Sequence, residues 1–247
     1  IATRHDSHAS LAERALLAGK SVFVEKPLAL AEDELDCIAA AVHGAAGQPV
    51  LMVGFNRRFA PLAVKMKSML DQLAEPKTFV VTVNAGAIPP DHWTQDLEAG
   101  GGRIVGEACH FIDLLRYLVG APIERLHSIR LGQPAGGVAD DKATLVLEFA
   151  DGSHGTIHYF ANGSKAFPKE RVEAFGGGRI LQLDNFRTLR AWGWPGFGKL
   201  SRRQDKGHSA CAAAFVAALK SGNPAPIPLE EVLEVSRWSI RAARFGD

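Results

Sequence analysis

The stretch SVFVEKPLAL, Ser21 to Leu30, joins an apolar run to a charged pair and a proline. Its apolar residues, Val22 to Val24, suit a parallel sheet that is covered on both faces, where strands are continuous apolar runs rather than alternating ones. Glu25 and Lys26 follow at once. Charge at the end of a buried strand requires a reason, and open α/β sheets bind ligands beyond the carboxyl ends of their strands.

Strand and helix patterns alternate on both sides of this stretch, from Ile1 to about Phe55. The residues IAT at the start suit the end of a strand, and VLMVGF, Val50 to Phe55, suits a buried strand. Apolar residues recur between the strands at helical spacing, and Glu32 to Glu34 favour the positive end of the second helix. This alternation predicts parallel strands joined by right-handed crossovers. Because three strands are few for a doubly wound sheet, we expect the first half of a nucleotide-binding fold to be missing upstream of Ile1.

The pattern changes at about Arg58, where antiparallel strands begin to dominate. Asp151-Gly152 stands at the centre of KATLVLEFADGSHGTIHYFA and is a strong hairpin signal. Two further turns are predicted at Gly176 to Gly178 and at Asp184-Asn185. RIVGEACHFIDLLRYLVG predicts a helix between the first of these strands and the rest.

These patterns predict two domains of α/β and α+β class. Residues 1–57 would be the C-terminal part of a Rossmann-like parallel sheet, the remainder of a dinucleotide-binding domain. Residues 58–247 would form an α+β domain for substrate binding and oligomerisation, with an open, mostly antiparallel sheet of six or so strands covered by helices on one face. Two helices, about residues 207–220 and 229–245, close the chain, and we expect the last to pack back on the first domain.

The composition argues against several classes of function. With 28 Lys and Arg against 27 Asp and Glu, the formal charge is +1, so no net field attracts nucleic acid or an anionic membrane. No apolar run approaches the roughly 20 residues of a membrane-spanning helix. The three cysteines are far apart and odd in number, which favours a reducing compartment over a disulfide framework. We expect a cytoplasmic protein that binds neither nucleic acid nor membrane.

Lys26 stands where the ligand of an open sheet would bind. At a partly desolvated strand end its ammonium group can hold a substrate oxygen or exchange protons near neutral pH. Pro27 would fix the turn that aims the lysine, a cis bond being one way to do so. On the tripeptide alone a simpler interpretation is favoured, in which Lys26 is solvated and paired with Glu25 and Pro27 only ends the strand.

A second cluster, AGGGRIVGEACHFID, spans Ala99 to Asp113. Its three glycines allow the backbone to approach a ligand closely just before a helix. On that helix Gly106, His110 and Asp113 fall on one face, and Glu107 neighbours His110. A histidine is the usual proton acceptor when a hydroxyl is oxidised, and a nearby carboxylate would orient it and hold it charged. An inert, hydrogen-bonded histidine at a helix packing surface explains the same residues.

Together the two clusters resemble a known family. AGKSVFVEKPLAL, GFNRRFAP and GGGRIVGEACHFIDLLRYLVG are similar to the signatures of the glucose-fructose oxidoreductase and inositol dehydrogenase family, often written Gfo/Idh/MocA, over nearly the whole chain. The resemblance implies an oxidoreductase that transfers a hydride between NAD or NADP and a hydroxyl carbon of a sugar, polyol or sugar nucleotide. It also implies a homodimer or tetramer formed through the antiparallel sheet. GEACHFID and DKGH, Asp205 to His208, are most similar to members fused behind a zinc-type dehydrogenase.

The resemblance implies roles for individual residues. Lys26 would bind the reacting oxygen and His110 would relay its proton, with Glu107 and Asp113 beside it. The residues expected on the cofactor side are Thr3, His5, His8, Glu25, Lys26, Pro27 and Arg58. Those expected on the substrate side are Arg57, His92, Trp93, Gly102 and His208.

Simpler interpretations exist for most of the remaining candidates. The residues from Thr3 to His8 also suit a helix cap with solvated histidines. Arg57 and Arg58 suit a bidentate clamp on a phosphate or carboxylate, or surface ion pairs. Lys206 and His208 suit contacts to an anionic substrate, or a solvated cap. No metal site is predicted, because the histidines at 154 and 158 would be roughly 13 Å apart in a strand.

Two departures from the family pattern limit what the resemblance implies. Family members commonly place an aspartate four residues before the histidine, where this chain has Gly106; either Glu107 substitutes from a different angle or the site is altered. The chain also lacks a strand-borne GxGxxG with an acidic residue about twenty positions on, the sequence that cradles the pyrophosphate. We therefore expect these residues alone to bind the cofactor weakly or not at all and to be inactive alone, which a titration with NAD or NADP would test.

Two other functions stay open. One is that of an NAD-dependent glycosidase-type family member, which uses redox chemistry only transiently and would accumulate no net NADH. The other is that of a non-catalytic fragment for dimerisation or substrate binding, which would dimerise without turnover.

Overall fold

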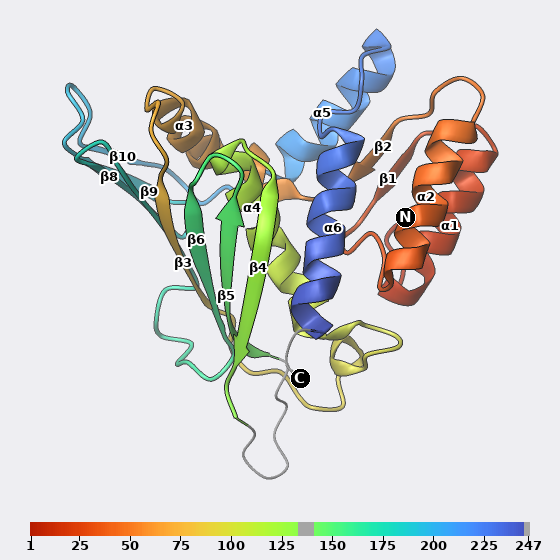
Figure 1. Ribbon diagram of the computed structural model, residues 1–247, viewed down its shortest axis with the longest axis horizontal. Helices are drawn as coiled ribbons and strands as arrows, with labels where there is room; N and C mark the ends of the chain where they lie inside the picture. Colours follow the sequence, from red (N-terminus) through yellow and green to blue (C-terminus); the bar gives the residue numbers. More distant parts are fainter. Residues whose placement is uncertain (133–140, 245–247) are drawn as a thin grey trace.

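The computed structural model describes residues 1–132 and 141–244 of the chain. It contains a small parallel sheet and a large mixed sheet, which stand apart in Figure 1. In the small sheet β1, Val22–Val24, pairs in parallel with β2, Leu51–Val53. Ile1 continues this sheet, because its amine donates to the backbone oxygen of Phe23 at 2.7 Å and its own backbone oxygen accepts from the Glu25 amide at 2.9 Å. The predicted alternation of parallel strands and helices is confirmed.

Two helices accompany the small sheet, α1 (His8–Leu17) and α2 (Glu32–Gly44). Helix α1 packs against β1 and against α2. The acidic start of α2 is used as predicted for a helix N-terminus, since the carboxylate of Glu34 accepts the backbone amides of Leu30 and Ala31 at 2.9 and 3.1 Å. The turn after β1 is thereby tied to α2.

The large sheet has eight strands in the order β10-β9-β8-β7-β3-β6-β5-β4. Among the described strands of this large sheet, β3 and β6 are the one parallel pair. The predicted turns join β5 to β6, β7 to β8 and β8 to β9. The pattern misses two strands at opposite edges, because β4 is largely polar and β10 is only three residues long. The strands are β3 (Thr78–Asn84), β4 (Ile123–Arg130), β5 (Lys142–Phe149), β6 (His154–Phe160), β7 (Glu170–Gly176), β8 (Arg179–Asp184), β9 (Thr188–Trp192) and β10 (Lys199–Ser201).

Helices cover one face of the large sheet. Helix α3 (Pro61–Leu70) packs on β8 and β9, α4 (Cys109–Val119) on β6, and α6 (Leu229–Arg244) on β4. Side chains alternate accordingly, so that Leu145 and Leu147 of β5 are buried while Thr144 and Val146 are half-exposed on the other face. The predicted fold, a Rossmann-like parallel sheet followed by an open, mostly antiparallel sheet covered on one face, is confirmed.

Helix α6 lies between the two sheets in Figure 1 and contacts α2 and β2 as well as β4. Its arginines hold it there, since Arg237 donates to Asp36 at 2.9 Å and Arg241 to Glu32 at 2.9 Å. Phe245, included in the predicted helix, lies outside the described residues. None of the helices in residues 1–132 and 141–244 is long and apolar enough to cross a membrane.

Candidate active site

Lys26 connects the end of β1 to the helix that carries His110. Its Nζ donates to the backbone oxygen of Gly106 at 2.6 Å and to Oε1 of Glu107 at 3.3 Å. The Lys26–Pro27 peptide bond is cis, and the lysine side chain is 17% exposed. Glu25 is exposed and is not the partner of Lys26, so the interpretation of a solvated Lys26–Glu25 pair is wrong.

A turn of π-helix carries both partners of Lys26. The sequence predicts one α-helix here, but five residues near its start, Ile104–Ala108, form a π turn that leads directly into α4. π turns are rare in proteins, and those that occur often lie at functional sites. Burial opposes the ionisation of Glu107, but the charges of Lys26, Lys169 and Arg57 outweigh it and hold the pKa of Glu107 below its usual value. Glu107 is therefore a carboxylate at neutral pH.

His110 lies on the first turn of α4 and is only 6% exposed. Its Nδ1 is buried and has no hydrogen-bond partner among the described residues, and its ring stands edge-on to that of Phe55. Burial lowers the pKa of His110 well below its usual value, and the positive charges of Arg57 and Lys26 lower it further. The expectation that a carboxylate holds His110 charged is wrong, because desolvation and cationic neighbours keep the imidazole neutral.

Asp113 and Arg58 form a buried ion pair with each other. Nη2 of Arg58 donates to Oδ1 of Asp113 at 2.6 Å, its Nε lies 3.1 Å from both carboxylate oxygens, and its Nη1 donates to Glu231 of α6 at 2.9 Å. Asp113 was expected beside His110 and Arg58 beside the cofactor. The two charges neutralise each other, and Arg58 connects Asp113 on α4 to Glu231 on α6. We therefore leave Asp113 and Arg58 out of the proposed site.

Arg57 and Lys206 share one buried carboxylate, that of Glu170 at the start of β7. Arg57 donates to both oxygens at 3.0 and 3.3 Å, and Lys206 donates to Oε1 at 2.8 Å. Glu170 is 1% exposed. The predicted substrate contact Arg57 is thus held in an ion pair, although its charge still acts on His110.

The segment before α5 (His208–Ser221) is pressed against the turn that carries Arg57. The backbone oxygen of Lys206 accepts from the Asn56 side chain at 2.7 Å. A Cβ atom on Gly207, whose φ is +84°, would stand 2.4 Å from the backbone oxygen of Asn56, so only glycine fits there. This contact brings the charges of Lys206 and His208 close enough to act on His110.

The loop with His92 and Trp93 packs on the segment after Ile1. Nδ1 of His5 lies 2.7 Å from the backbone oxygen of Gly100, and its ring stands edge-on to Trp93 with 4.7 Å between centroids. His92 is exposed, and its side chain bonds to Thr94 within its own loop. Burial lowers the pKa of His5. His5 is therefore a packing residue between this loop and the π turn.

His8 and the glycine run also serve the local structure. The ring of His8, which is 1% exposed, lies 2.8 Å from the backbone oxygen of Pro27 and 3.1 Å from that of Thr3. A Cβ atom on Gly100 would stand 2.5 Å from the backbone oxygen of Trp93, and Gly102 is buried with a φ of +72°. The glycines are needed for a tight loop, and the contact of Gly102 with a substrate stays a prediction.

Sequence reasoning does not single out Lys169 and Glu170. They stand in FPKERVEAF at the start of β7, where no motif marks them. They reach Glu107 and Arg57 only because β7 lies beside β3 in the sheet. Thr3 is exposed, and its Oγ1 accepts from Ser7.

Two family models match the chain. Residues 1–55 match the model described as "Oxidoreductase family, NAD-binding Rossmann fold", and residues 64–180 match that of the "GFO/IDH/MocA C-terminal domain". The inositol 2-dehydrogenase of Rhizobium meliloti (strain 1021) is 26% identical over 195 residues, covering 76% of this chain and 57% of that protein. Inositol 2-dehydrogenase 1 of Saccharopolyspora erythraea is 30% identical over 203 residues, covering 79% and 58%. The chain thus spans little more than half the length of these relatives.

Solved structures share the fold along almost the whole chain. An oxidoreductase domain protein from Kribbella flavida has a TM-score of 0.84 at 25% identity, covering 98% of this chain and 76% of that one. Levoglucosan dehydrogenase in complex with NADH and levoglucosan has a TM-score of 0.83 at 21% identity, covering 98% and 77%.

Proposed function

Because the chain belongs to the Gfo/Idh/MocA oxidoreductase family, we propose that it serves to oxidise a hydroxyl carbon of a sugar or polyol with a nicotinamide dinucleotide. The observation that carries the proposal is the hydrogen bond from Lys26 Nζ to the backbone oxygen of Gly106. It sets an ammonium group at the carboxyl end of a parallel strand, where open α/β sheets bind ligands, and His110 follows on the same helix.

The described residues fit one end of such a cofactor. Thr3 and Glu25 are exposed where the chain leaves the small sheet, beside Lys26 and Pro27, and would meet the nicotinamide end. The pyrophosphate of such a cofactor is cradled by a glycine-rich turn between a parallel strand and a helix. We find no such turn in residues 1–132 or 141–244, and β1 is followed by Glu25 to Pro27 instead. When bound, the nicotinamide supplies the hydride acceptor.

Lys26 holds the reacting oxygen in this proposal. An ammonium group has three donors, and Gly106 and Glu107 use two of them. The third is left for the substrate hydroxyl. The positive charge stabilises the alkoxide character that this oxygen gains as the hydride leaves. Glu107 accepts from Lys26 and thereby orients it, which makes Glu107 a positioning residue.

His110 accepts the hydroxyl proton in this proposal. Since the imidazole is neutral, it has a lone pair for a proton at neutral pH. The buried Nδ1 leaves Nε2 as the ring atom that would face the substrate. The oxidation breaks one C–H and one O–H bond: the hydride leaves with its electron pair for the nicotinamide, the proton goes to His110, and a carbonyl forms.

Reduced nicotinamide can be followed with NAD or NADP and myo-inositol, levoglucosan or D-glucose as trial substrates. We expect it to accumulate when the wild-type chain is supplied with a pyrophosphate-cradling segment ahead of Ile1, and to be lost in Lys26→Met and His110→Asn of that same protein. Accumulation of reduced nicotinamide in both variants at the wild-type level would contradict the assigned roles. Cleavage of a glycoside without net accumulation would favour the glycosidase-type alternative, and a dimer that never turns over would favour the non-catalytic one.

A further inference from the structure

Positive charge exceeds negative charge around His110. The charges that act on His110 and Glu107 come from four separate segments, which the fold brings together at the ends of β1 and β7. Four cations stand against two carboxylates, so two positive charges are left over. The cations are Lys26, Arg57, Lys169 and Lys206, and the carboxylates are Glu107 and Glu170.

Glu170 is the first source of the excess. A single carboxylate at 1% exposure accepts from both Arg57 and Lys206, within 3.0 and 2.8 Å. One carboxylate neutralises only one of these two cations. Arg57 is itself 6% exposed, so water compensates little of the remaining charge.

Lys169 is the second source. It precedes Glu170, is exposed, and its positive charge helps to lower the pKa of Glu107. No carboxylate in residues 1–132 or 141–244 forms an ion pair with Lys169, whereas Lys26 and Lys206 each have one. Lys169 directly precedes Glu170, so an ammonium group without a carboxylate partner among the described residues adjoins the cluster of Arg57, Glu170 and Lys206.

From this arrangement we propose that the substrate carries an anionic group, a carboxylate or a phosphate, and that Lys169 binds it. The inference rests on the proposed function for the location of the substrate. A neutral polyol would leave both extra charges uncompensated once it excluded water, whereas an anion neutralises at least one of them. The preference is local, because the chain as a whole has a formal charge of only +1.

Calorimetric binding of D-glucuronate, D-glucose 6-phosphate and D-glucose tests the proposal without requiring turnover. It is measured on the full chain with and without NAD. We expect the tighter of the two anionic ligands to bind about tenfold or more tightly than D-glucose, the discrimination typical of a hydrogen bond to a charged group. Which of the two binds tighter distinguishes a carboxylate from a phosphate. The affinity for the anion should fall with added salt, and that for D-glucose should not.

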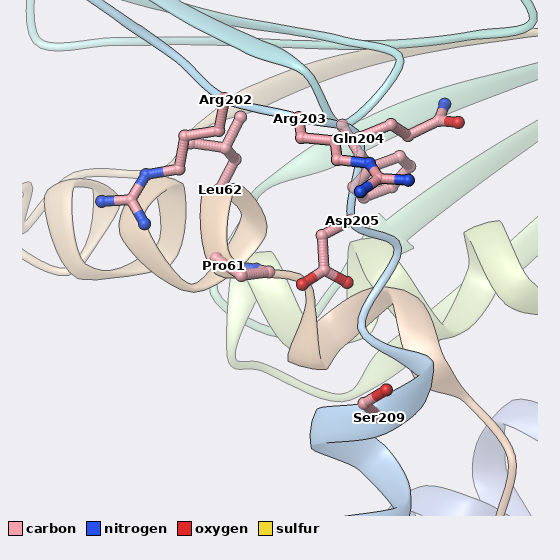
Figure 2. A pocket seen from close by; sticks show the side chains of 8 residues that line it. Pro61, Leu62, Arg202, Arg203, Gln204, Asp205 and Ser209 are labelled. Carbon is pink, nitrogen blue, oxygen red and sulfur yellow. The ribbon is translucent and has the colours of Figure 1, made fainter.

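Variants of Lys169 show whether the preference arises at this residue. Lys169→Gln should abolish it and Lys169→Arg should retain it. The control is Arg203→Gln, which removes the same charge from a separate cavity of about 590 Å³, lined by Arg202, Arg203 and Asp205 beside the start of α3 (Figure 2). The control should leave the preference unchanged, since Lys26 and His110 do not line that cavity.

The outcomes separate this inference from the proposed function. Anion binding that depends on Lys169, without any hydride transfer, would support the inference and contradict the function. Oxidation of neutral sugars, with equal affinity for anionic and neutral ligands, would support the function and overturn the inference. No binding of either anion at millimolar concentration, or a preference unchanged in Lys169→Gln, would also overturn it.

Discussion

The imidazole of His5 fills the space that a side chain on Gly106 would need. A Cβ atom at residue 106 would stand 2.9 Å from Cε1 and 3.3 Å from Nδ1 of His5. His5 cannot retreat easily, because Nδ1 bonds to Gly100 and the ring packs on Trp93. An aspartate at residue 106, which the family resemblance leads one to expect, therefore has no room here, and Glu107, the next residue, supplies the carboxylate that meets Lys26.

Substituting Gly106 should strain this contact. We expect Gly106→Ala to lower the free energy of unfolding by about 1–3 kcal/mol, the usual result of overpacking a filled site. Gly106→Asp should do the same without raising activity, since its carboxylate would have to displace His5. Chemical denaturation measures the effect. Combining either change with His5→Ala should recover part of the loss, and an unchanged stability in Gly106→Ala would contradict the packing argument.

Removing the ammonium group of Lys26 should affect catalysis far more than folding. We expect Lys26→Met to lower kcat/KM by about a hundred- to a thousandfold, the usual result of losing one donor to a developing oxyanion. Lys20→Met is the matched control, since Lys20 is exposed in the turn between α1 and β1. Steady-state kinetics, with circular dichroism to check the fold, make the comparison. An equal loss in the two variants would contradict a special role for Lys26.

Local patterns were sufficient to predict most of the fold. Three patterns that each lie within a short stretch predicted a strand, a helix and a hairpin. They are the apolar run Val22 to Val24, the helical stripe after Glu32 and the Asp151-Gly152 turn, and all three predictions are confirmed. Strand β10 was missed because its three residues carry no periodicity. The π turn was missed because the spacing of Gly106 and His110 fits an ordinary helix equally well.

The candidate site was harder to predict, since its charges pair across long distances in sequence. Helical spacing places Asp113 near His110, but the partner of Asp113 is Arg58, 55 residues away. Glu170 meets Arg57 from 113 residues away. Only the packing of α4, β7 and the Asn56–Phe59 turn shows which carboxylate neutralises which cation, so these pairs follow from tertiary structure rather than from local pattern.

The carboxylate of Glu170 should matter for stability, since it lies between two cations. We expect Glu170→Gln to lower the free energy of unfolding by about 3–5 kcal/mol, because it leaves Arg57 and Lys206 near one another with no compensating charge. The matched control is Glu148→Gln, which breaks an exposed pair with Arg125 and should cost less than about 1 kcal/mol. Urea denaturation of the three proteins compares them, and similar costs for the two variants would contradict the distinction.

The contribution of two buried histidines to stability should fall as the pH drops below about 6.5, the usual pKa of histidine. Burial lowers the pKa of His110, and also that of His5, in the folded protein. Below pH 6.5 the unfolded chain therefore binds protons that the folded chain does not, and the free energy of unfolding decreases by at most about 1.4 kcal/mol per pH unit for each such group. Below about pH 4.5 the lowered pKa values of Glu107 and Glu170 add a further loss of stability.

The variant His110→Asn tests this origin of the pH dependence. It should flatten the slope of the free energy of unfolding against pH between about 6.5 and about 4.5, whereas His154→Asn, at an exposed residue of β6, should leave that slope unchanged. Urea denaturation across this pH range provides the measurement, and an identical slope in wild type and His110→Asn would show that His110 titrates normally.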